Sequence, residues 1–168
     1  PGSVGYALDV NSVKLFDDKG YKVKTGAVGE IGIKGPNVFV AYYKNKEQYK
    51  SVFKDEYFLT GDLGYEADNG KLFFSDRKKD LIIKGGVNIF PGEIDEVVFS
   101  HEMVKESATI GIDDPYLGSR IKTYIVLKEG ASFVQEDIRQ FCFNKLGDFK
   151  CPDEFEVIEE IPKGPSGK

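Results

Sequence analysis

A charged cluster at residues 76–80, Asp-Arg-Lys-Lys-Asp, separates two segments of the chain that have different hydrophobic patterns. Before the cluster, apolar and polar residues alternate over residues 12–16 and 29–34, which indicates β-strands. After it, apolar runs typical of strands are mixed with apolar residues at helical spacings of three and four. The cluster is short, which is typical of a hinge rather than of a linker. The sequence therefore predicts an α+β chain, with a β-rich, barrel-like unit at residues 1–78 and a small mixed α/β unit at residues 79–168.

Two local signals mark turns and a helix in the first segment. Asn45 is expected to cap a short helix that runs through Phe53. A second hairpin is expected over residues 63–75, because Asn69-Gly70 supplies the positive φ angle that a tight turn needs.

The second segment contains signals for a reversal and two helices. Gly85-Gly86 predicts a tight reversal after a strand at residues 81–84, and Pro91 is expected to open a helix. Ser132, with Gln135 three residues later, forms a capping-box pattern that predicts the start of another helix. The other expected elements are strands at residues 107–112 and 121–127, and the apolar helix faces are Ile94, Val97 and Val98, then Ile138, Phe141 and Cys142.

Composition excludes several classes of protein. The 168 residues are 40% hydrophobic and 30% charged, which is typical of globular domains. The net charge of −5 comes from interleaved Lys, Asp and Glu, which argues against a nucleic-acid partner. No apolar run approaches about 18 residues, so no integral membrane segment is expected, and we predict a cytoplasmic protein. Cys142 and Cys151 are expected to be a packing residue and a spectator thiol rather than catalytic groups.

Thr60-Gly61-Asp62 is the first group that could carry chemistry. Glycine allows a ligand to approach the backbone, and a carboxylate can accept hydrogen bonds from both hydroxyls of a ribose. Fifteen residues later, Arg77 offers a planar set of donors suited to ribose or phosphate oxygens. Taken singly, Asp62 is more typical of a local backbone cap, and Arg77 of a surface ion pair with Asp76 or Asp80.

Two other groups are candidates. Gly85-Gly86 leaves room for a narrow ligand arm beside the backbone, although the same pair can be a plain strand turn. Lys168 ends a loop stiffened by proline and glycine, which can hold one cation at a fixed place, although a solvated terminal lysine is the simpler interpretation. The terminal Gly-Lys is not a P-loop, because Pro162 stands where that motif needs a glycine.

In this order and spacing, the motifs resemble those of the adenylate-forming superfamily of acyl-CoA synthetases, nonribosomal adenylation domains and luciferases. The resemblance implies that residues 1–78 are the C-terminal β-subdomain of a large N-terminal domain and that residues 79–168 are a mobile C-terminal lid. The similar segments are residues 1–5, 29–31, 35–43, 59–64, 76–80, 84–95 and 163–168, which extend over essentially the whole chain.

The resemblance implies a nucleotide site and a catalytic lysine. Asp62 would bind the ribose hydroxyls of ATP or AMP, and Arg77 would assist at the ribose or a phosphate. Lys168 would bridge the substrate carboxylate and the α-phosphate during adenylation. A magnesium ion would help to stabilise the charge on the phosphates, but no metal ligand is expected among the residues of this chain.

The resemblance also implies an enzyme that carries out two reactions at one site, with a lid that rotates between them. Lys79 would be the hinge residue about which the lid rotates. After pyrophosphate leaves, Lys84, Gly85 and Gly86 would line the passage for a pantetheine thiol, while Lys168 withdraws.

The implied activity is that of an AMP-forming acyl-CoA synthetase, an acid-thiol ligase. Such an enzyme joins a carboxylic acid to AMP and then transfers the acyl group to CoA. Residues 149–152, Phe-Lys-Cys-Pro, and the Lys163-Gly164-Pro165 segment before the final lysine resemble acyl-CoA synthetases more than peptide-synthetase adenylation domains, and a fatty or related acid is the favoured substrate class. The alternatives are an enzyme that loads a carrier-protein pantetheine and a noncatalytic module that senses a nucleotide or CoA. We expect the 168-residue chain alone to be inactive, because it has no phosphate loop, adenine-binding motif or acyl pocket.

Overall fold

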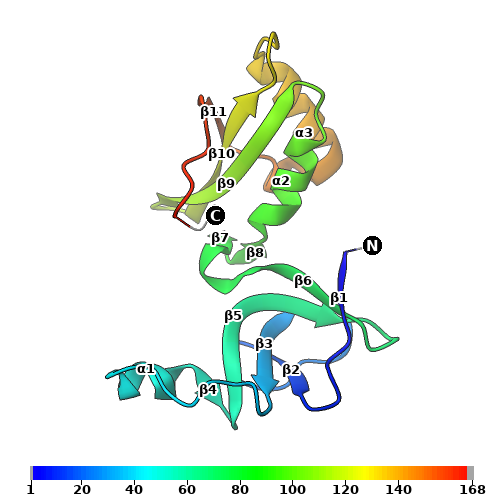
Figure 1. Ribbon diagram of the computed structural model, residues 1–168. Coiled ribbons are helices and arrows are strands. Elements are labelled where there is room, and N and C mark those ends of the chain that lie inside the picture. The colour runs from blue at the N-terminus through cyan, green and yellow to red at the C-terminus, as the bar shows by residue number, and fades with distance from the viewer. Residues whose placement is uncertain (1, 166–168) are drawn as a thin grey trace. The chain divides into compact units, whose positions relative to one another are not determined.

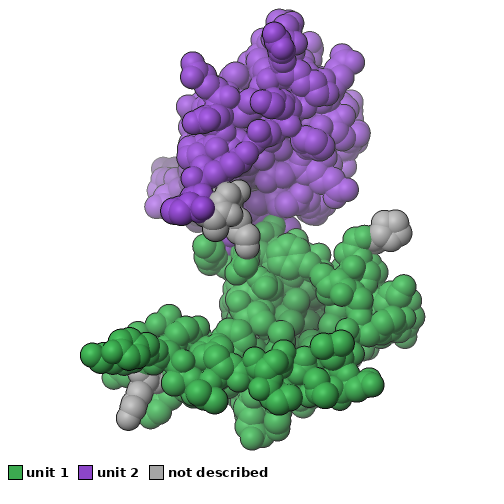
Figure 2. All heavy atoms as spheres, viewed as in Figure 1, with its two compact units in different colours: residues 1–79 green, residues 80–168 purple. Residues whose placement is uncertain are grey.

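The chain divides into two units, and each unit contains one β-sheet (Figure 1). The computed structural model describes residues 2–165, and its units are Pro1–Lys79 and Asp80–Lys168, drawn in different colours in Figure 2. The boundary thus falls one residue after the end of the predicted first unit. The fold class is confirmed, because a β-rich unit precedes a mixed α/β unit. The roles of the units as a subdomain and a mobile lid stay predictions.

The first unit is an antiparallel six-stranded sheet with one short helix, α1 (Lys46–Ser51). Its hydrogen-bonded order is β1-β6-β5-β3-β2, with β4 paired to β5. Among the described residues no ladder joins β1 to β2, so the sheet is open rather than closed into a barrel. The strands are β1 (Ser3–Gly5), β2 (Ser12–Phe16), β3 (Gly29–Lys34), β4 (Phe53–Lys54), β5 (Tyr57–Glu66) and β6 (Leu72–Arg77).

The local signals of the first unit are confirmed with small shifts. The Asn45 side chain accepts the Gln48 N–H at 3.0 Å and caps α1, but the helix ends at Ser51 because Phe53 enters β4. In the turn between β5 and β6, Gly70 has a φ of +78° while Asn69 keeps a negative φ. Only the glycine of the Asn-Gly pair therefore adopts the positive φ angle, which glycine does without steric cost.

The second unit is a five-stranded sheet with two helices on one face (Figure 1). Strand β10 pairs antiparallel with β9 and β7 and parallel with β11, while β8 pairs with β7. The elements are β7 (Ile82–Lys84), β8 (Val87–Ile89), α2 (Pro91–Phe99), β9 (Val104–Asp114), β10 (Gly118–Leu127), α3 (Gln135–Lys150) and β11 (Glu154–Val157).

The start of α3 corrects the capping-box prediction. The N-cap residue is Val134, its side chain makes no capping hydrogen bond, and Ser132 lies outside the helix. A cap is worth about 1 kcal/mol, whereas burying one large apolar side chain is worth about 1.5–3 kcal/mol. Ile138 and Cys142 are both fully buried, so we infer that their burial sets where this helix begins.

A single apolar core holds the second unit together. It joins β-strand residues to the inner faces of α2 and α3, and both cysteines belong to it. Burial raises the pKa of the Cys142 thiol to about 12, which keeps it protonated. Cys151 is only 7% exposed and is therefore a core residue as well. The buried members are Ile82, Ile89, Ile94, Val98, Val104, Ile121, Ile125, Ile138, Cys142 and Cys151.

The sequence predicted no integral membrane segment. Within residues 2–165, no helix has the length and apolar character needed to cross a membrane.

The central position of β10 gives a stability prediction. Ile125→Ala should lower the free energy of unfolding by about 2–5 kcal/mol, because Ile125 is fully buried and the truncation leaves a cavity. Ile110→Ala, on the neighbouring strand, is the control and should cost much less, because Ile110 is 42% exposed. Urea unfolding followed by circular dichroism measures both. Equal losses would contradict the assignment of the core.

Candidate active site

The Thr60-Gly61-Asp62 segment forms a bulge inside strand β5. Glu30 of β3 is opposite Leu63 and Gly32 is opposite Leu59, so the three bulge residues face only Ile31. The segment was expected at the start of a hairpin, but it lies in the middle of a ten-residue strand. Bulges redirect side chains and are common next to functional sites, and this one leaves Asp62 without a partner in the β3–β5 ladder.

Side chains satisfy the backbone groups that the bulge leaves without ladder partners. The Gly61 N–H donates to Glu30 Oε1 at 3.1 Å, and the Asp62 N–H donates to Thr60 Oγ1 at 3.1 Å. Thr60 Oγ1 in turn donates to the Ile31 carbonyl at 2.9 Å. Gly61 has a φ of +75°, and a Cβ built on it would contact nothing within 4 Å. Glycine is therefore favoured at residue 61 by its backbone angle rather than by lack of space.

Asp62 and Arg77 come together across the β5–β6 ladder. The two residues are direct partners in the antiparallel register. Arg77 Nε lies 2.8 Å from Asp62 Oδ1, and the side chains are 46% and 30% exposed. The Arg77 backbone N–H donates to Asp76 Oδ1 at 2.7 Å, so Asp76 contacts the main chain of this residue. The two predicted nucleotide-binding residues thus form one charged site at the edge of the bulge.

The Asp62 carboxylate has the acceptor capacity that a ribose diol requires. Asp62 Oδ1 is buried beside Arg77 Nε, but the Asp62 side chain as a whole is 30% exposed, so a ligand can reach the rest of it. Carboxylate oxygens can accept hydrogen bonds from the hydroxyl groups of a ribose. The residues present therefore fit a bound nucleotide.

A cavity of about 390 Å³ adjoins the inner side of the bulge. The aromatic rings of Tyr42 and Phe58 and the charged groups of Glu30 and Lys78 contribute to its wall, together with Thr60 and Gly61. Two of the three bulge residues, Thr60 and Gly61, therefore border this cavity.

Lys78 fixes the end of the first unit. Its ammonium lies 2.9 Å from Glu30 Oε2 and 3.2 Å from Asp18 Oδ1. The hydrogen bond to Glu30 raises the pKa of Lys78 above its ordinary value, with a smaller contribution from Asp18. The next residue, Lys79, is exposed within a 3₁₀ turn over Lys78–Asp80, at the boundary between the units.

The predicted passage residues lie on the hairpin of β7 and β8. Gly85 and Gly86 form its two-residue turn with φ angles of +56° and +79°, which confirms the tight reversal. A Cβ on Gly86 would meet nothing within 4 Å, whereas one on Gly85 would lie 3.6 Å from the Phe149 ring. Gly86 therefore borders open space, and Gly85 contacts the second unit's own side chains.

Lys84 differs from its glycine neighbours because its ammonium is already engaged. Its side chain is 7% exposed, and Nζ lies 3.0 and 2.9 Å from the two carboxylate oxygens of Asp153. Asp153 Oδ2 also accepts the Ile121 N–H at 2.7 Å. Lys84 thus joins β7 to the start of β11, and its role in a passage stays a prediction.

The approach to the predicted catalytic lysine is held to the second sheet. The Lys163 ammonium lies 2.8 Å from Glu106 on β9, and this contact lowers the pKa of the Glu106 carboxyl. Lys168 itself lies outside the described residues.

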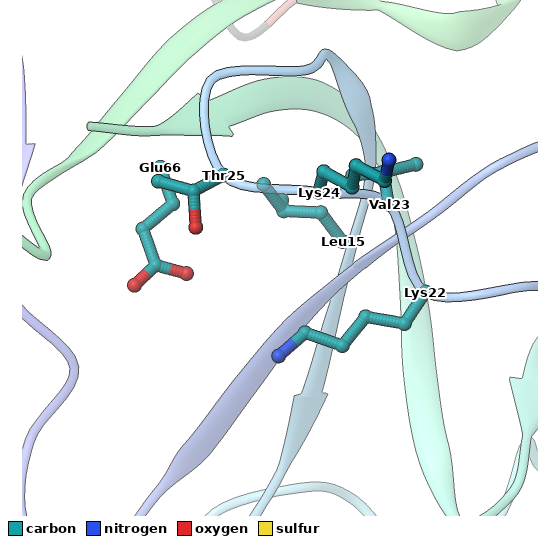
Figure 3. Close-up of a pocket in the computed structure, with 6 residues that line it drawn as sticks. All are labelled: Leu15, Lys22, Val23, Lys24, Thr25 and Glu66. Carbon is teal, nitrogen blue, oxygen red and sulfur yellow. The ribbon is translucent and has the colours of Figure 1, made fainter. Parts of the chain in front are cut away.

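A second hollow in the first unit lacks the features of a site. It has a volume of about 470 Å³ and is lined by Leu15, Lys22, Val23, Lys24, Thr25 and Glu66. Figure 3 shows that the charged ends of its two lysines and of Glu66 lie apart rather than converging on one point. Within residues 2–165, no group of three or more His, Cys, Asp or Glu side chains could hold a metal ion.

Comparison with known proteins identifies the family. Residues 93–168 match the AMP-binding enzyme C-terminal domain. The whole chain is 42% identical over 168 residues to a sulfoacetate–CoA ligase of Cupriavidus necator and 36% identical over 169 residues to a long-chain-fatty-acid–CoA ligase of Bacillus subtilis. The chain belongs to the adenylate-forming superfamily.

The alignments cover nearly all of this chain but only part of each relative. They include 99% and 100% of this chain but 33% and 30% of the two ligases, so the chain spans about a third of their length. The structure of ATP-bound MatB from Rhodopseudomonas palustris superimposes with a TM-score of 0.94 at 34% identity, covering 99% of this chain and 34% of that one. An o-succinylbenzoate CoA synthetase from Bacillus subtilis, in complex with ATP and a magnesium ion, gives a TM-score of 0.88 at 35% identity over the same shares.

The buried Lys84–Asp153 pair gives a second prediction. Lys84→Met should lower the free energy of unfolding by about 3 kcal/mol, because it leaves a partly buried carboxylate without its cation. Lys34→Met is the matched control and should have little effect, because Lys34 pairs with Glu56 on an exposed surface. Urea unfolding measures both, and a Lys84 variant as stable as the control would contradict a structural role for the pair.

Proposed function

We propose that this chain is the C-terminal part of an ATP-dependent acyl-CoA synthetase. The observation that carries the proposal is the partly exposed Asp62 carboxylate on the β5 bulge, paired with Arg77 of β6, a combination suited to a ribose and a phosphate. The relatives named above as CoA ligases support the same conclusion. The reaction would join a carboxylic acid to AMP, release pyrophosphate, and then form a thioester with CoA. The full enzyme would require ATP, Mg²⁺ and CoA.

Three residues have distinct roles in the first half-reaction, the formation of the acyl-adenylate. Asp62 binds the ribose hydroxyls of ATP, and Arg77 holds the Asp62 carboxylate and supplies donors to the ribose or a phosphate. As the carboxylate of the acid substrate attacks the α-phosphorus of ATP, negative charge gathers on the phosphate oxygens. Lys168 supplies an ammonium at these oxygens, so its effect is greater in the transition state than in the ground state.

The second half-reaction uses the lid. It rotates about Lys79, removes Lys168 from the phosphate and brings the Gly85-Gly86 turn to the pantetheine thiol. The open space beside Gly86 is the feature that supports this assignment. Lys84 contributes by fixing the base of the hairpin through Asp153.

The acyl substrate is proposed to be a fatty or related acid. One relative is named for a long-chain fatty acid and another for sulfoacetate, so the family accepts chemically different acids. A carrier-protein pantetheine is the alternative acceptor. A noncatalytic module that senses a nucleotide or CoA is the alternative of a different class, and it would keep its biological activity after Lys168→Ala. The proposed location is the cytoplasm.

Product analysis tests the reaction. The longer protein that contains this chain, given ATP, Mg²⁺, CoA and carboxylates from acetate to long-chain and aromatic acids, should yield an acyl-CoA detected by mass spectrometry. The 168-residue chain alone is the control and should yield none. An acyl-adenylate without transfer to CoA would favour a carrier-loading enzyme, and turnover by the chain alone would contradict its proposed dependence on the rest of the protein.

Two variants should separate the half-reactions. Lys168→Ala should slow adenylation by roughly 10²- to 10³-fold, because it removes one preorganised charge from the transition state. Gly86→Leu should mainly slow thioester formation, because it fills the open side of the turn. Pyrophosphate release and thioester formation are measured separately in single-turnover experiments. Equal losses in both half-reactions for both variants would overturn the alternation of the lid.

A further inference from the structure

The least expected part of the candidate site is Glu30, a buried carboxylate on the neighbouring strand. The Glu30 side chain is only 10% exposed, whereas charged side chains are mostly exposed. Burying a charge is costly unless it is paired and hydrogen-bonded. Glu30 meets both conditions by using its two oxygens for different partners: Oε1 accepts the Gly61 N–H and Oε2 accepts from the Lys78 ammonium.

The first of these contacts acts on the shape of the bulge. Gly61 is at the middle of the three residues that face Ile31, so its N–H has no place in the β3–β5 ladder. An unsatisfied backbone N–H in this partly buried position would favour a different local conformation. The next residue is Asp62, whose carboxylate must face the ligand. A shift of the Gly61 backbone would therefore move the proposed ribose-binding group.

The second contact acts on the last residue before the predicted hinge. Lys78 is followed by Lys79, and its ammonium contacts Glu30 more closely, at 2.9 Å, than it contacts Asp18, at 3.2 Å. Asp18 is 83% exposed, so water screens its charge more than that of Glu30. Glu30 is thus the principal anchor of Lys78 in the first unit.

We propose that Glu30 is a positioning residue that holds the Gly61-Asp62 bulge in its nucleotide-binding shape and at the same time anchors Lys78 beside the hinge. The proposal rests on the proposed function for its link to nucleotide binding. Its structural half, the control of the bulge, stands on the contacts alone. Glu30 does not touch the nucleotide; it acts through Gly61, Asp62 and Lys78.

Three variants separate the two contacts. Glu30→Ala removes both, whereas Glu30→Gln preserves the side-chain volume and one acceptor oxygen but removes the charge that Lys78 needs. Lys78→Met leaves the Gly61 contact intact and removes the ion pair. Glu56→Gln is the matched control, because it removes a carboxylate that pairs with a lysine on an exposed surface of the same unit.

Amide hydrogen exchange of residues 59–63 in the full-length protein tests the structural half. Exchange should accelerate at least about ten-fold in Glu30→Ala, because the Gly61 N–H loses its acceptor, and much less in Glu30→Gln and Lys78→Met. Circular dichroism checks that each variant is folded. Unchanged exchange at Gly61 in the folded Glu30→Ala protein would overturn the proposal.

Calorimetric titration with AMP and steady-state kinetics of the same proteins test the functional half. Glu30→Ala should weaken AMP binding and raise the KM for ATP by about ten-fold, the value of one hydrogen bond to a charged group, with little change in the KM for the carboxylic acid. Glu30→Gln should recover part of the loss, and Glu56→Gln should behave as the wild type. Equal changes in the KM for ATP and for the acid would indicate general destabilisation and overturn the positioning role.

A failure of the proposed function would look different. A wild-type protein that neither binds AMP nor consumes ATP would overturn the proposed function and the nucleotide link together. The exchange experiment would still decide whether Glu30 controls the bulge.

Discussion

Each unit depends on a partly or fully buried carboxylate that accepts both a backbone N–H and a lysine ammonium. Glu30 accepts from Gly61 and Lys78 in the first unit, and Asp153 accepts from Ile121 and Lys84 in the second. Neither carboxylate would be stable in its position without both partners, because charge burial and unmade backbone hydrogen bonds are each costly. The two lysines are therefore structural as well as charged, and each fixes an end of a strand.

The arrangement explains how a regular sheet can present an irregular site. A bulge of three residues breaks the β3–β5 ladder, yet its N–H groups at Gly61 and Asp62 have side-chain acceptors. The two strands thus stay paired on both sides of the bulge, at Leu59 and Leu63, although the register shifts across it. Asp62 is held on a rigid element rather than on a loop, which favours a defined position relative to Arg77 on the next strand.

Local periodicity predicted most elements, because an element such as strand β10 or helix α2 buries one face. It did not predict β8 and β11, which have three and four residues and too little alternation to be recognised. The capping pattern at Ser132 gave the wrong start, because the N-cap residue is Val134 and the helix has buried side chains but no side-chain cap. The motif resemblance singled out Asp62 and Arg77, and the structure brings them into contact across the β5–β6 ladder. Glu30 and Asp153 were missed as anchors, since their partners Gly61 and Lys84 lie 31 and 69 residues away and no local pattern encodes such pairs.

The anchoring of Lys78 also limits where any rotation of the lid can begin. Residues up to Lys78 are held by the β5–β6 ladder, which extends to Arg77, and by the two carboxylates that contact the Lys78 ammonium. From Asp80 onward the chain belongs to the second unit, whose core includes Ile82. Only the backbone around Lys79 lies between these two fixed regions. A rotation that left both sheets intact would have to use the φ and ψ angles there, which supports the proposal that Lys79 is the hinge residue.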